Sequence, residues 1–281
     1  MTDALVPLHF LRSLWLTGPD ARGFLQGQLS SDLSEVSPAR GQLSAWHDAK
    51  GRVLAFLRVL PRPDDGFALV MQADLVETVE RRMRMFVLRA KVAIENGPPV
   101  YGLAHAPDGT GFVAGLAPGE GPLAAACDAS TSVLRMPGSV GWLVVSTDPA
   151  RVTATDAAAE ARWSLAETAA GLPEVFPATQ GEFVAQMLNL DRIGAVSFTK
   201  GCYPGQEIIA RAHHLGRVKR RARPFRAPGP APAPGDALAD AAGTVVRAAG
   251  DADGCLLLAV VAEDAPGPFA LADGRPLSPA G

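Results

Sequence analysis

One short segment, residues 200–207, concentrates the side chains that could do chemistry. It holds a lysine, a thiol, a phenol, an amide and a carboxylate, together with two glycines and a proline. Pro204-Gly205 predicts a tight turn, and Gly201 allows a positive φ. A turn of this kind gathers polar side chains without a bulky backbone between them. The chain then enters residues 206–211, whose pattern favours a helix.

Cys202 is the candidate nucleophile or soft-metal ligand of this segment. Lys200 offers a nearby positive charge, and a helix that begins near Gln206 would direct its positive dipole end towards the turn. Both features lower a thiol pKa and favour the reactive thiolate. The alternative is a turn that holds a buried structural cysteine, because lone cysteines are often small core residues. Cys127 and Cys255 lack such neighbours, and we expect both to be inert packing residues.

The elements that must position this segment are predicted from the pattern of apolar residues. Residues 43–60 and 67–72 favour strands, and residues 97–146 alternate short apolar runs with glycine and proline, as an antiparallel sheet does. Residues 74–89 favour a helix with one apolar stripe. That stripe consists of Val76, Val79, Met83, Phe86 and Val87. The chain after Arg217 favours a small all-β unit, so we expect an α+β fold.

Residues 200–207 resemble the K-G-C-Y-x-G-Q-E signature of the YgfZ-type folate-binding proteins, and all seven fixed positions match. Residues 181–191 and 194–199 are similar to the stretches that precede the signature in that family. Residues 24–32 resemble the family's first helix and its exit. The resemblance covers about residues 10–225. It implies the fold of the glycine-cleavage aminomethyltransferases, in which three domains surround a central folate-binding channel.

The same resemblance implies a domain division and a set of partners. A discontinuous folate-binding domain comprises residues 1–46 and 150–212, an α+β domain is inserted at 47–149, and a C-terminal β-barrel spans 213–281. The implied cofactor is tetrahydrofolate or a derivative. The implied clients are iron–sulfur enzymes, including those that modify tRNA, whereas a direct contact with tRNA is left open.

The resemblance also implies the residues of the site. Around Cys202, the signature contributes Lys200, Gly201, Tyr203, Gly205, Gln206 and Glu207. The expected folate contacts are Trp46, beside His47 and Asp48, together with Arg162, Glu167, Gln186 and Asn189. The alternative for Trp46 is a place in the core. The alternative for Arg162 and Glu167 is an ordinary pair on a helix surface.

A run of seven cations follows the signature, with no acidic residue among them. Its members are Arg211, Arg217, Lys219, Arg220, Arg221, Arg223 and Arg226. Three interpretations stay open: the run is a solvated strand edge, it binds the polyglutamate tail of a folate, or it binds nucleic-acid phosphates. The lack of interleaved aromatic residues weakens the last for single-stranded RNA. His213 and His214 are adjacent and point in different directions in a regular element, so we expect no metal site.

Two positions depart from the transferases, which carry an acidic pair in the strand that follows Gly51. The corresponding residues here are Leu54 and Ala55, and neither can act as a general acid or base. We therefore expect a folate-binding accessory protein in iron–sulfur enzyme maintenance, with Cys202 as a reactive or cluster-contacting thiol. The alternatives are a folate-dependent aminomethyl transferase and a tRNA-binding regulator that uses residues 211–226.

Composition sets the remaining bounds. The chain has 281 residues, of which 48% are hydrophobic and 20% charged, and this excludes a disordered protein. A net charge of −3 excludes recruitment of nucleic acid by the overall field. Three widely spaced cysteines argue against a disulfide framework and for a reducing compartment. With no basic leader and no apolar run long enough to cross a membrane, we expect a cytoplasmic monomer.

Overall fold

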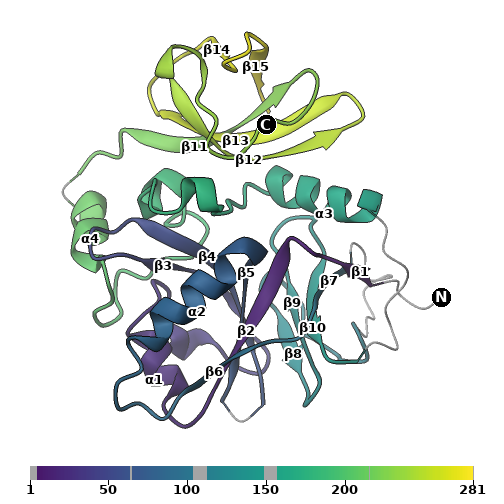
Figure 1. Ribbon diagram of the computed structural model, residues 1–281, viewed down its shortest axis with the longest axis vertical. Coiled ribbons are helices and arrows are strands. Elements are labelled where there is room, and N and C mark those ends of the chain that lie inside the picture. Colours follow the sequence, from purple (N-terminus) through teal and green to yellow (C-terminus); the bar gives the residue numbers. More distant parts are fainter. Residues whose placement is uncertain (1–4, 64, 104–112, 149–156, 215, 281) are drawn as a thin grey trace.

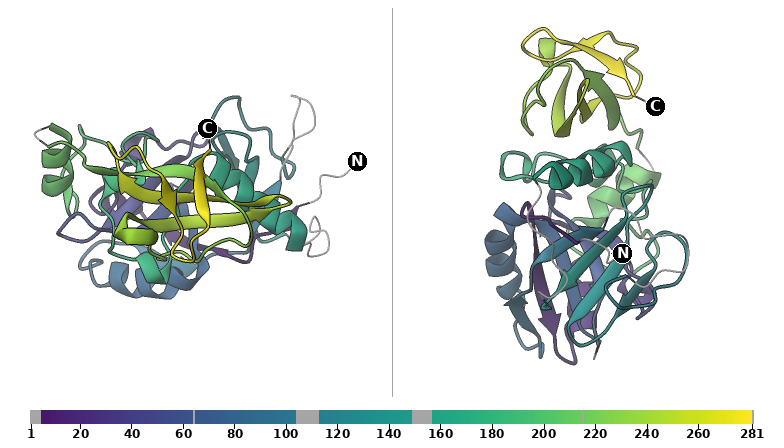
Figure 2. Two further views of the ribbon diagram at one scale, coloured as in Figure 1. Left: turned by 90° about the horizontal axis from the view of Figure 1, so that it is seen from above. Right: turned by 90° about the vertical axis from the view of Figure 1, so that its right-hand side faces the viewer.

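The computed structural model describes residues 5–63, 65–103, 113–148, 157–214 and 216–280. Within these residues the strands form three five-stranded sheets. The third sheet lies at the C-terminal end of the molecule, and a layer that contains helix α3 (Ala157–Ala169) separates it from the other two (Figure 1 and Figure 2). The expected α+β class is confirmed.

The first sheet has the strand order β3-β4-β5-β2-β6, and neighbouring strands are antiparallel. Its strands are β2 (Leu11–Thr17), β3 (Gln42–His47), β4 (Val53–Pro61), β5 (Phe67–Gln72) and β6 (Ala93–Asn96). β3, β4 and β5 are buried along their whole length, so both faces of the sheet are covered there. The helical elements between them are α1 (Ala21–Gln26), η1 (Leu33–Glu35), η2 (Ala73–Leu75) and α2 (Val76–Arg84). α2 crosses one face and buries Val76, Val79 and Met83 (Figure 1).

The second sheet has the order β1-β7-β10-β9-β8 and is also antiparallel. Its strands are β1 (Val6–Pro7), β7 (Val100–Leu103), β8 (Ala125–Cys127), β9 (Thr131–Arg135) and β10 (Trp142–Ser146). These strands confirm the antiparallel sheet that was expected within residues 97–146. The expected domain boundary between residues 46 and 47 falls inside β3, which pairs with β4, so both strands belong to the first sheet.

The third sheet has the order β12-β13-β11-β15-β14. Its strands are β11 (Arg220–Ala227), β12 (Gly243–Asp251), β13 (Gly254–Ala262), β14 (Phe269–Ala270) and β15 (Pro276–Pro279). The expected all-β unit is confirmed, but a closed barrel is not, because the strand pairing leaves β12 and β14 as edges. Isolated bridges link the two sides, Ala237 with Thr244 and Leu238 with Leu271, just before η6 (Ala239–Ala241).

The helix expected over residues 74–89 is shorter than its apolar stripe indicated. α2 ends at Arg84, and the backbone N–H groups of Met85, Phe86 and Val87 each donate to the carbonyl three residues earlier. Phe86 is 50% exposed, so it does not share the buried face of Val76, Val79 and Met83 with which the stripe grouped it. An apolar stripe assumes a constant rotation of roughly 100° per residue, and this assumption no longer holds for Phe86 because α2 ends at Arg84.

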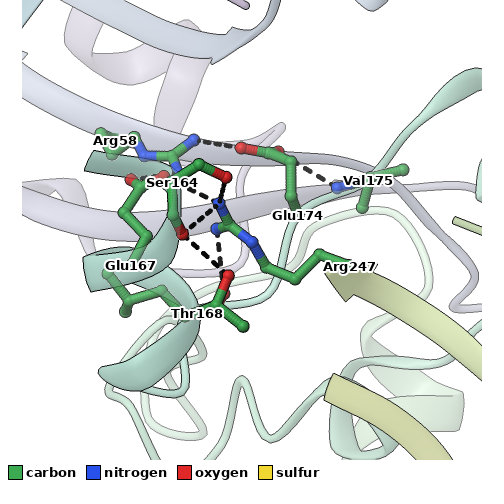
Figure 3. Close-up of polar contacts among 8 residues, drawn as sticks. Arg58, Ser164, Glu167, Thr168, Glu174, Val175 and Arg247 are labelled. Atoms are coloured by element: carbon green, nitrogen blue, oxygen red, sulfur yellow. Dashed lines mark hydrogen bonds and ion pairs between the residues drawn. The ribbon is translucent and has the colours of Figure 1, made fainter. Parts of the chain in front are cut away.

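A buried group of four charged side chains joins the first sheet, the α3 layer and the third sheet (Figure 3). Arg58 of β4 donates from Nη2 to Glu167 Oε1 and from Nη1 to Glu174 Oε2, both at 2.7 Å. Arg247 of β12 donates from Nη2 to Glu167 Oε2 at 3.2 Å. All four side chains are buried, so two cations and two anions neutralise one another inside the protein.

Further hydrogen bonds complete this four-charge network. Arg247 also donates to the carbonyl of Leu172 at 3.2 Å and to the carbonyl of Ser164 at 3.3 Å, which ties β12 to α3 and to the chain just after it. Burial alone would raise the pKa of Glu167, but Arg58 and Arg247 outweigh burial and lower it. For Glu174, burial outweighs the attraction of Arg58, and the pKa is raised.

We expect Glu167→Gln to lower the free energy of unfolding by about 3–5 kcal/mol, because two buried guanidinium groups would then share one carboxylate. Urea denaturation at pH 7 measures this loss. Arg217→Gln is the matched control, because it breaks an ion pair whose two side chains are 76% and 73% exposed, and it should change stability little. Equal losses in the two variants would contradict the structural importance of the network.

Candidate functional site

The signature segment leads into helix α4 (Gln206–His214) and packs against the turn between β3 and β4. Gly205 has φ +79°, and a Cβ atom there would lie 2.5 Å from the carbonyl oxygen of Asp48 and 2.6 Å from Gly51 Cα. This position therefore requires glycine for its conformation and for its space. The Asp48 carboxylate fixes the opposing turn by accepting from the N–H groups of Lys50 and Arg52, both at 2.9 Å. Two segments that the sequence marked separately thus lie in backbone contact.

Lys200 holds the signature segment to the exit of the first helix. Its buried Nζ donates to the backbone carbonyls of Gln26, Leu29 and Ser31 at 2.7, 2.8 and 2.8 Å. Burial lowers the pKa of Lys200 to about 8, and Asp32 opposes this shift. The lysine was expected to supply a positive charge beside the thiol, whereas its ammonium group is bound on three sides by carbonyl oxygens.

Ser30 makes a second connection at the same place. Its hydroxyl donates to the carbonyl of Ala195 at 2.7 Å, and its own carbonyl accepts from the N–H of Ser197 at 2.8 Å. The hydroxyl also accepts from the N–H of Ala45 in β3 at 3.0 Å. The resemblance marked residues 24–32 only as a helix and its exit, and the structure shows why this stretch matters: it anchors the loop that carries the signature.

Tyr203 and His47 form a buried aromatic pair. Their ring centroids are 6.2 Å apart, and their side chains are almost fully buried. Burial raises the pKa of Tyr203 to about 12 and lowers the pKa of His47 to about 3, so both are neutral at pH 7. Neither ring nitrogen of His47 has a hydrogen-bond partner within the described part of the chain. Such a group is rare in folded proteins, so His47 marks a position where a bound polar molecule would be stabilised.

Cys202 and Gly201 lie on the exposed side of the turn. The Cys202 thiol is exposed, which excludes the alternative of a buried structural cysteine. Gly201 has no positive φ in the left-handed region, and a Cβ atom there would meet nothing within 4 Å. Cys255 is buried and Cys127 partly buried, and burial raises the pKa of both thiols. Their surroundings agree with the expected packing roles.

The signature continues into α4. Gln206 is partly buried and its Nε2 donates weakly to the carbonyl of Lys200 at 3.5 Å, while Glu207 is exposed. The helix expected to begin near Gln206 is confirmed. The exposed face of this turn therefore presents a thiol and a carboxylate, and its buried face presents a phenol and a lysine.

Three of the expected folate contacts already bind other parts of the protein. Trp46 is buried in the core and its Nε1 donates to Gln28 Oε1 at 3.4 Å. Gln186 donates from Nε2 to the carbonyl of Ile209 at 2.7 Å, while its Oε1 is buried and has no partner in the part of the chain that the structure describes. Asn189 donates from Nδ2 to a backbone carbonyl of β11 at 2.8 Å. Only Gln186 of these three keeps an unsatisfied buried polar atom.

The other two expected contacts do not form one site. Arg162 lies on the exposed face of α3, whereas the carboxylate of Glu167 lies in the four-charge network. The alternative of an ordinary surface pair does not hold either, because Glu167 is fully buried. The folate roles of these residues stay predictions.

The basic run has acidic partners that are distant in sequence. Three of its arginines form ion pairs: Arg217 with Asp264 at 2.7 Å, Arg226 with Asp251 at 2.5 Å, and Arg221 with Asp191 at 2.9 Å and with Glu263 at 3.7 Å. Arg221 is almost fully buried and also donates to the carbonyl of Gln186 at 2.9 Å, so it stabilises the loop before the signature. These three cations are paired with acidic residues of the chain itself, and only Arg221 is paired in a buried place.

Four cations of the run have no carboxylate partner among the described residues. Arg220 and Arg223 donate to the carbonyls of Ala242 and Ala265, at 3.3 and 3.1 Å. Arg211 and Lys219 are exposed. If the run binds an anion, these four residues remain for the purpose.

The departure from the transferases is structural as well as chemical. Leu54 and Ala55 are buried in β4 among the core residues, and the Leu54 carbonyl accepts from Gln180 Nε2 at 2.9 Å. In the described residues, no group of three or more His, Cys, Asp or Glu side chains could hold a metal ion. None of the described helices is long and apolar enough to cross a membrane.

Sequence comparison decides the family. No family model matches the chain. The tRNA-modifying protein YgfZ of Klebsiella pneumoniae (strain 342) is 35% identical over 222 residues, which cover 73% of this chain and 66% of the relative. The protein of the same name from Yersinia pestis (strain Pestoides F) is 30% identical over 227 residues, which cover 77% and 68%. The chain belongs to the YgfZ family. It spans about two thirds of the length of these relatives.

Structural comparison confirms the expected fold of this YgfZ-family chain. The glycine cleavage system aminomethyltransferase T from Bartonella henselae superposes with a TM-score of 0.72 at 14% sequence identity. The match covers 98% of this chain and 85% of the transferase. At that identity the likeness establishes the fold alone, and the chemistry must be argued from the residues of the YgfZ-family chain itself.

Two glycines of the signature should respond differently to alanine. We expect Gly205→Ala to lower the free energy of unfolding by at least about 1–3 kcal/mol, because alanine is strained at this φ and clashes with the opposing turn. Gly201→Ala should change stability by less than about 0.5 kcal/mol, because the space around it is open. Urea denaturation of both variants tests this. Similar losses in the two would mean that the backbone contact does not determine the turn.

The stability of the protein should fall in acid because of His47. Its pKa is about 3 in the folded protein, against an ordinary 6.5, so between these values only the unfolded chain binds the proton. The free energy of unfolding therefore decreases as the pH falls below 6.5, by up to about 1.4 kcal/mol per pH unit. We expect His47→Phe to remove this part of the loss between pH 7 and pH 5 in urea denaturation. His9→Phe, at an exposed position, is the control, and an unchanged pH profile of His47→Phe would contradict the prediction.

Proposed function

We propose that this YgfZ-family chain binds a reduced folate and supports the assembly or repair of iron–sulfur enzymes, including enzymes that modify tRNA. Membership of the family and the name of its relatives, tRNA-modifying protein, support the connection with tRNA modification. The observation that carries the folate part is the buried pair of His47 and Tyr203 of the signature, in which both histidine nitrogens lack a partner among the described residues.

The chemistry of three buried side chains beside the signature fits a pterin. A pterin is a planar heterocycle with hydrogen-bond donors and acceptors on its edge, and it requires polar partners in a largely apolar pocket. His47 offers one donor and one acceptor in its neutral form, and the buried Oε1 of Gln186 offers a further acceptor. Tyr203 adds an aromatic face. These three side chains would hold the ring, and the folate would supply its one-carbon chemistry there.

The glutamate tail of the folate requires cations. Arg211, Lys219, Arg220 and Arg223 are the members of the basic run without a carboxylate partner in the described residues, and we assign the tail to this group. A folate tail is anionic at each glutamate, so attraction to these residues grows with tail length and weakens with salt.

We further propose that the chain does not transfer an aminomethyl carbon. The acidic pair of the transferases is replaced by Leu54 and Ala55, and both are buried in the core of β4. An apolar side chain can neither take nor give a proton, so the step that requires general acid or base chemistry has no residue at this position.

The proposed folate site is tested by equilibrium dialysis with tetrahydrofolate. We expect binding by the wild-type protein and at least about tenfold weaker binding by His47→Phe, because the variant keeps an aromatic ring and loses both ring nitrogens with their hydrogen bonds. His9→Phe should bind as the wild type does. In a reconstituted glycine cleavage assay the protein should form no methylenetetrahydrofolate. Absence of wild-type binding at millimolar folate would remove the cofactor from the proposal.

The proposed role of Cys202 is tested by complementation of a deletion strain. Serine keeps nearly the same volume but provides neither an easily formed thiolate nor a soft ligand. Because the thiol is exposed, we expect Cys202→Ser to leave the unfolding temperature unchanged and to reduce the activity of iron–sulfur enzymes in the cell. Cys127→Ser and Cys255→Ser serve as controls that should retain activity. Full restoration of activity by Cys202→Ser would show that the thiol has no function.

A further inference from the structure

An apolar turn projects from the end of α2. Met85, Phe86 and Leu88 are 71%, 50% and 86% exposed. Ile208 is the fourth large hydrophobic residue that is exposed in the described part of the chain, so three of the four lie within this one turn. Concentrations of exposed apolar side chains on a soluble protein mark interaction sites more often than chance positions do.

The 85–88 turn is held in place and is not a frayed helix end. The N–H groups of Met85, Phe86 and Val87 donate to carbonyls of α2 at 3.2, 2.9 and 3.2 Å, and the Val87 side chain packs against the core. Arg84 donates to Glu80 Oε1 at 2.7 Å and to the carbonyl of Ile94 in β6, which fixes the base of the turn. The exposed side chains are therefore presented on an ordered backbone, which lowers the entropy lost on binding.

Cations surround this turn. Residues 81–91 contain five of them and no acid, in a chain whose net charge is −3. They are Arg81, Arg82, Arg84, Arg89 and Lys91, and all five are exposed. Arg84 pairs with Glu80, whereas the other four have no ion-pair partner among the described residues. The surface thus combines an apolar centre with a positively charged rim.

The composition fits a protein partner better than a nucleic acid. Phenylalanine, methionine and arginine are enriched in protein interfaces, and an apolar centre with a charged rim is their usual anatomy. Single-stranded nucleic acid is bound by several stacked aromatic rings, and this turn has one. A phosphate backbone offers no apolar surface for the two most exposed side chains, Met85 and Leu88, to contact.

The surface borders the strand that carries the candidate site. The Arg82 guanidinium lies 5.7 Å from the ring centroid of Trp46, which precedes His47 in β3. A partner that contacts Arg82 would therefore be separated from the buried strand that carries His47 by a single side chain. Binding and the proposed folate chemistry would take place on connected elements.

We propose that the 85–88 turn and its cationic rim dock an acidic protein surface with an apolar pocket. This inference rests on the proposed function, under which the occupant is the iron–sulfur enzyme that the chain supports. Apolar burial of Met85, Phe86 and Leu88 provides the affinity, and the arginine rim accelerates encounter and selects an anionic partner.

The test uses two surface variants of the full chain, Phe86→Ser/Leu88→Ser and Arg81→Glu/Arg89→Glu. Binding is measured by titration calorimetry against a purified iron–sulfur tRNA-modifying enzyme of the same cell, and separately against tRNA. We expect each variant to bind the enzyme at least about tenfold more weakly, and wild-type affinity to fall with added salt. Arg12→Glu/Arg40→Glu, at two exposed cations elsewhere on the surface, is the matched control and should bind as the wild type does.

Folding and the proposed function are checked in parallel. The variants should keep the wild-type unfolding temperature and tetrahydrofolate affinity, and they should fail to restore tRNA modification in the deletion strain. If the wild type restores modification and the variants do so equally well, or if the wild type forms no complex with the enzyme, the docking inference is overturned while the proposed function stands. A loss confined to tRNA binding assigns the surface to RNA and also overturns it. If the wild type neither binds folate nor restores modification, the proposed function itself fails, and the inference fails with it.

Discussion

The buried four-charge network holds the architecture together. Burial of any one of its charges alone would cost desolvation free energy. The ion pairs offset this cost only when the first sheet, the α3 layer and the third sheet are in contact. Arg58 belongs to a strand buried along its whole length, and Arg247 belongs to the C-terminal sheet. The relative position of these parts is therefore set by charge matching as well as by apolar contact. Displacement of the third sheet would leave Glu167 with one cation fewer in an environment without water.

The signature segment shows a second use of a buried charge. Lys200 satisfies three carbonyls at the exit of the first helix, so its charge organises the backbone and is not presented beside the thiol. Cys202 is exposed on the other side of the same turn. The segment thus divides its residues between a buried face, which anchors, and an exposed face, which is available to other molecules. His47 lies close to the buried face and contributes the unsatisfied polar atoms.

Local features of the sequence were predictable because they depend on neighbours. The Pro204-Gly205 turn, the helix from Gln206 and the strands within residues 43–60, 67–72 and 97–146 follow from local residue types and periodicity. The acidic partners of the basic run were not predictable, since Asp191, Asp251 and Asp264 are 25–47 residues from the cations that they bind. The sequence pattern likewise could not distinguish Glu167 as a network residue from Glu167 as a ligand contact, because a carboxylate suits either role. Phe86 was misplaced because periodicity carries no signal for the residue at which a helix ends.

The three hydrogen bonds of the Lys200 ammonium group also determine when, during synthesis of the chain, the candidate site can form. The carbonyls that it binds precede it by 169–174 residues. At a translation rate of about 5–20 residues per second, the exit of the first helix leaves the ribosome roughly 9–35 s before the lysine does. During that interval the three carbonyls at the exit of the first helix have no lysine to donate to them, and water must supply their hydrogen bonds. The candidate site is therefore completed late, after most of the body of the protein has already been made, and a nascent chain that stalls before residue 200 has the strands of the first sheet but no closed site.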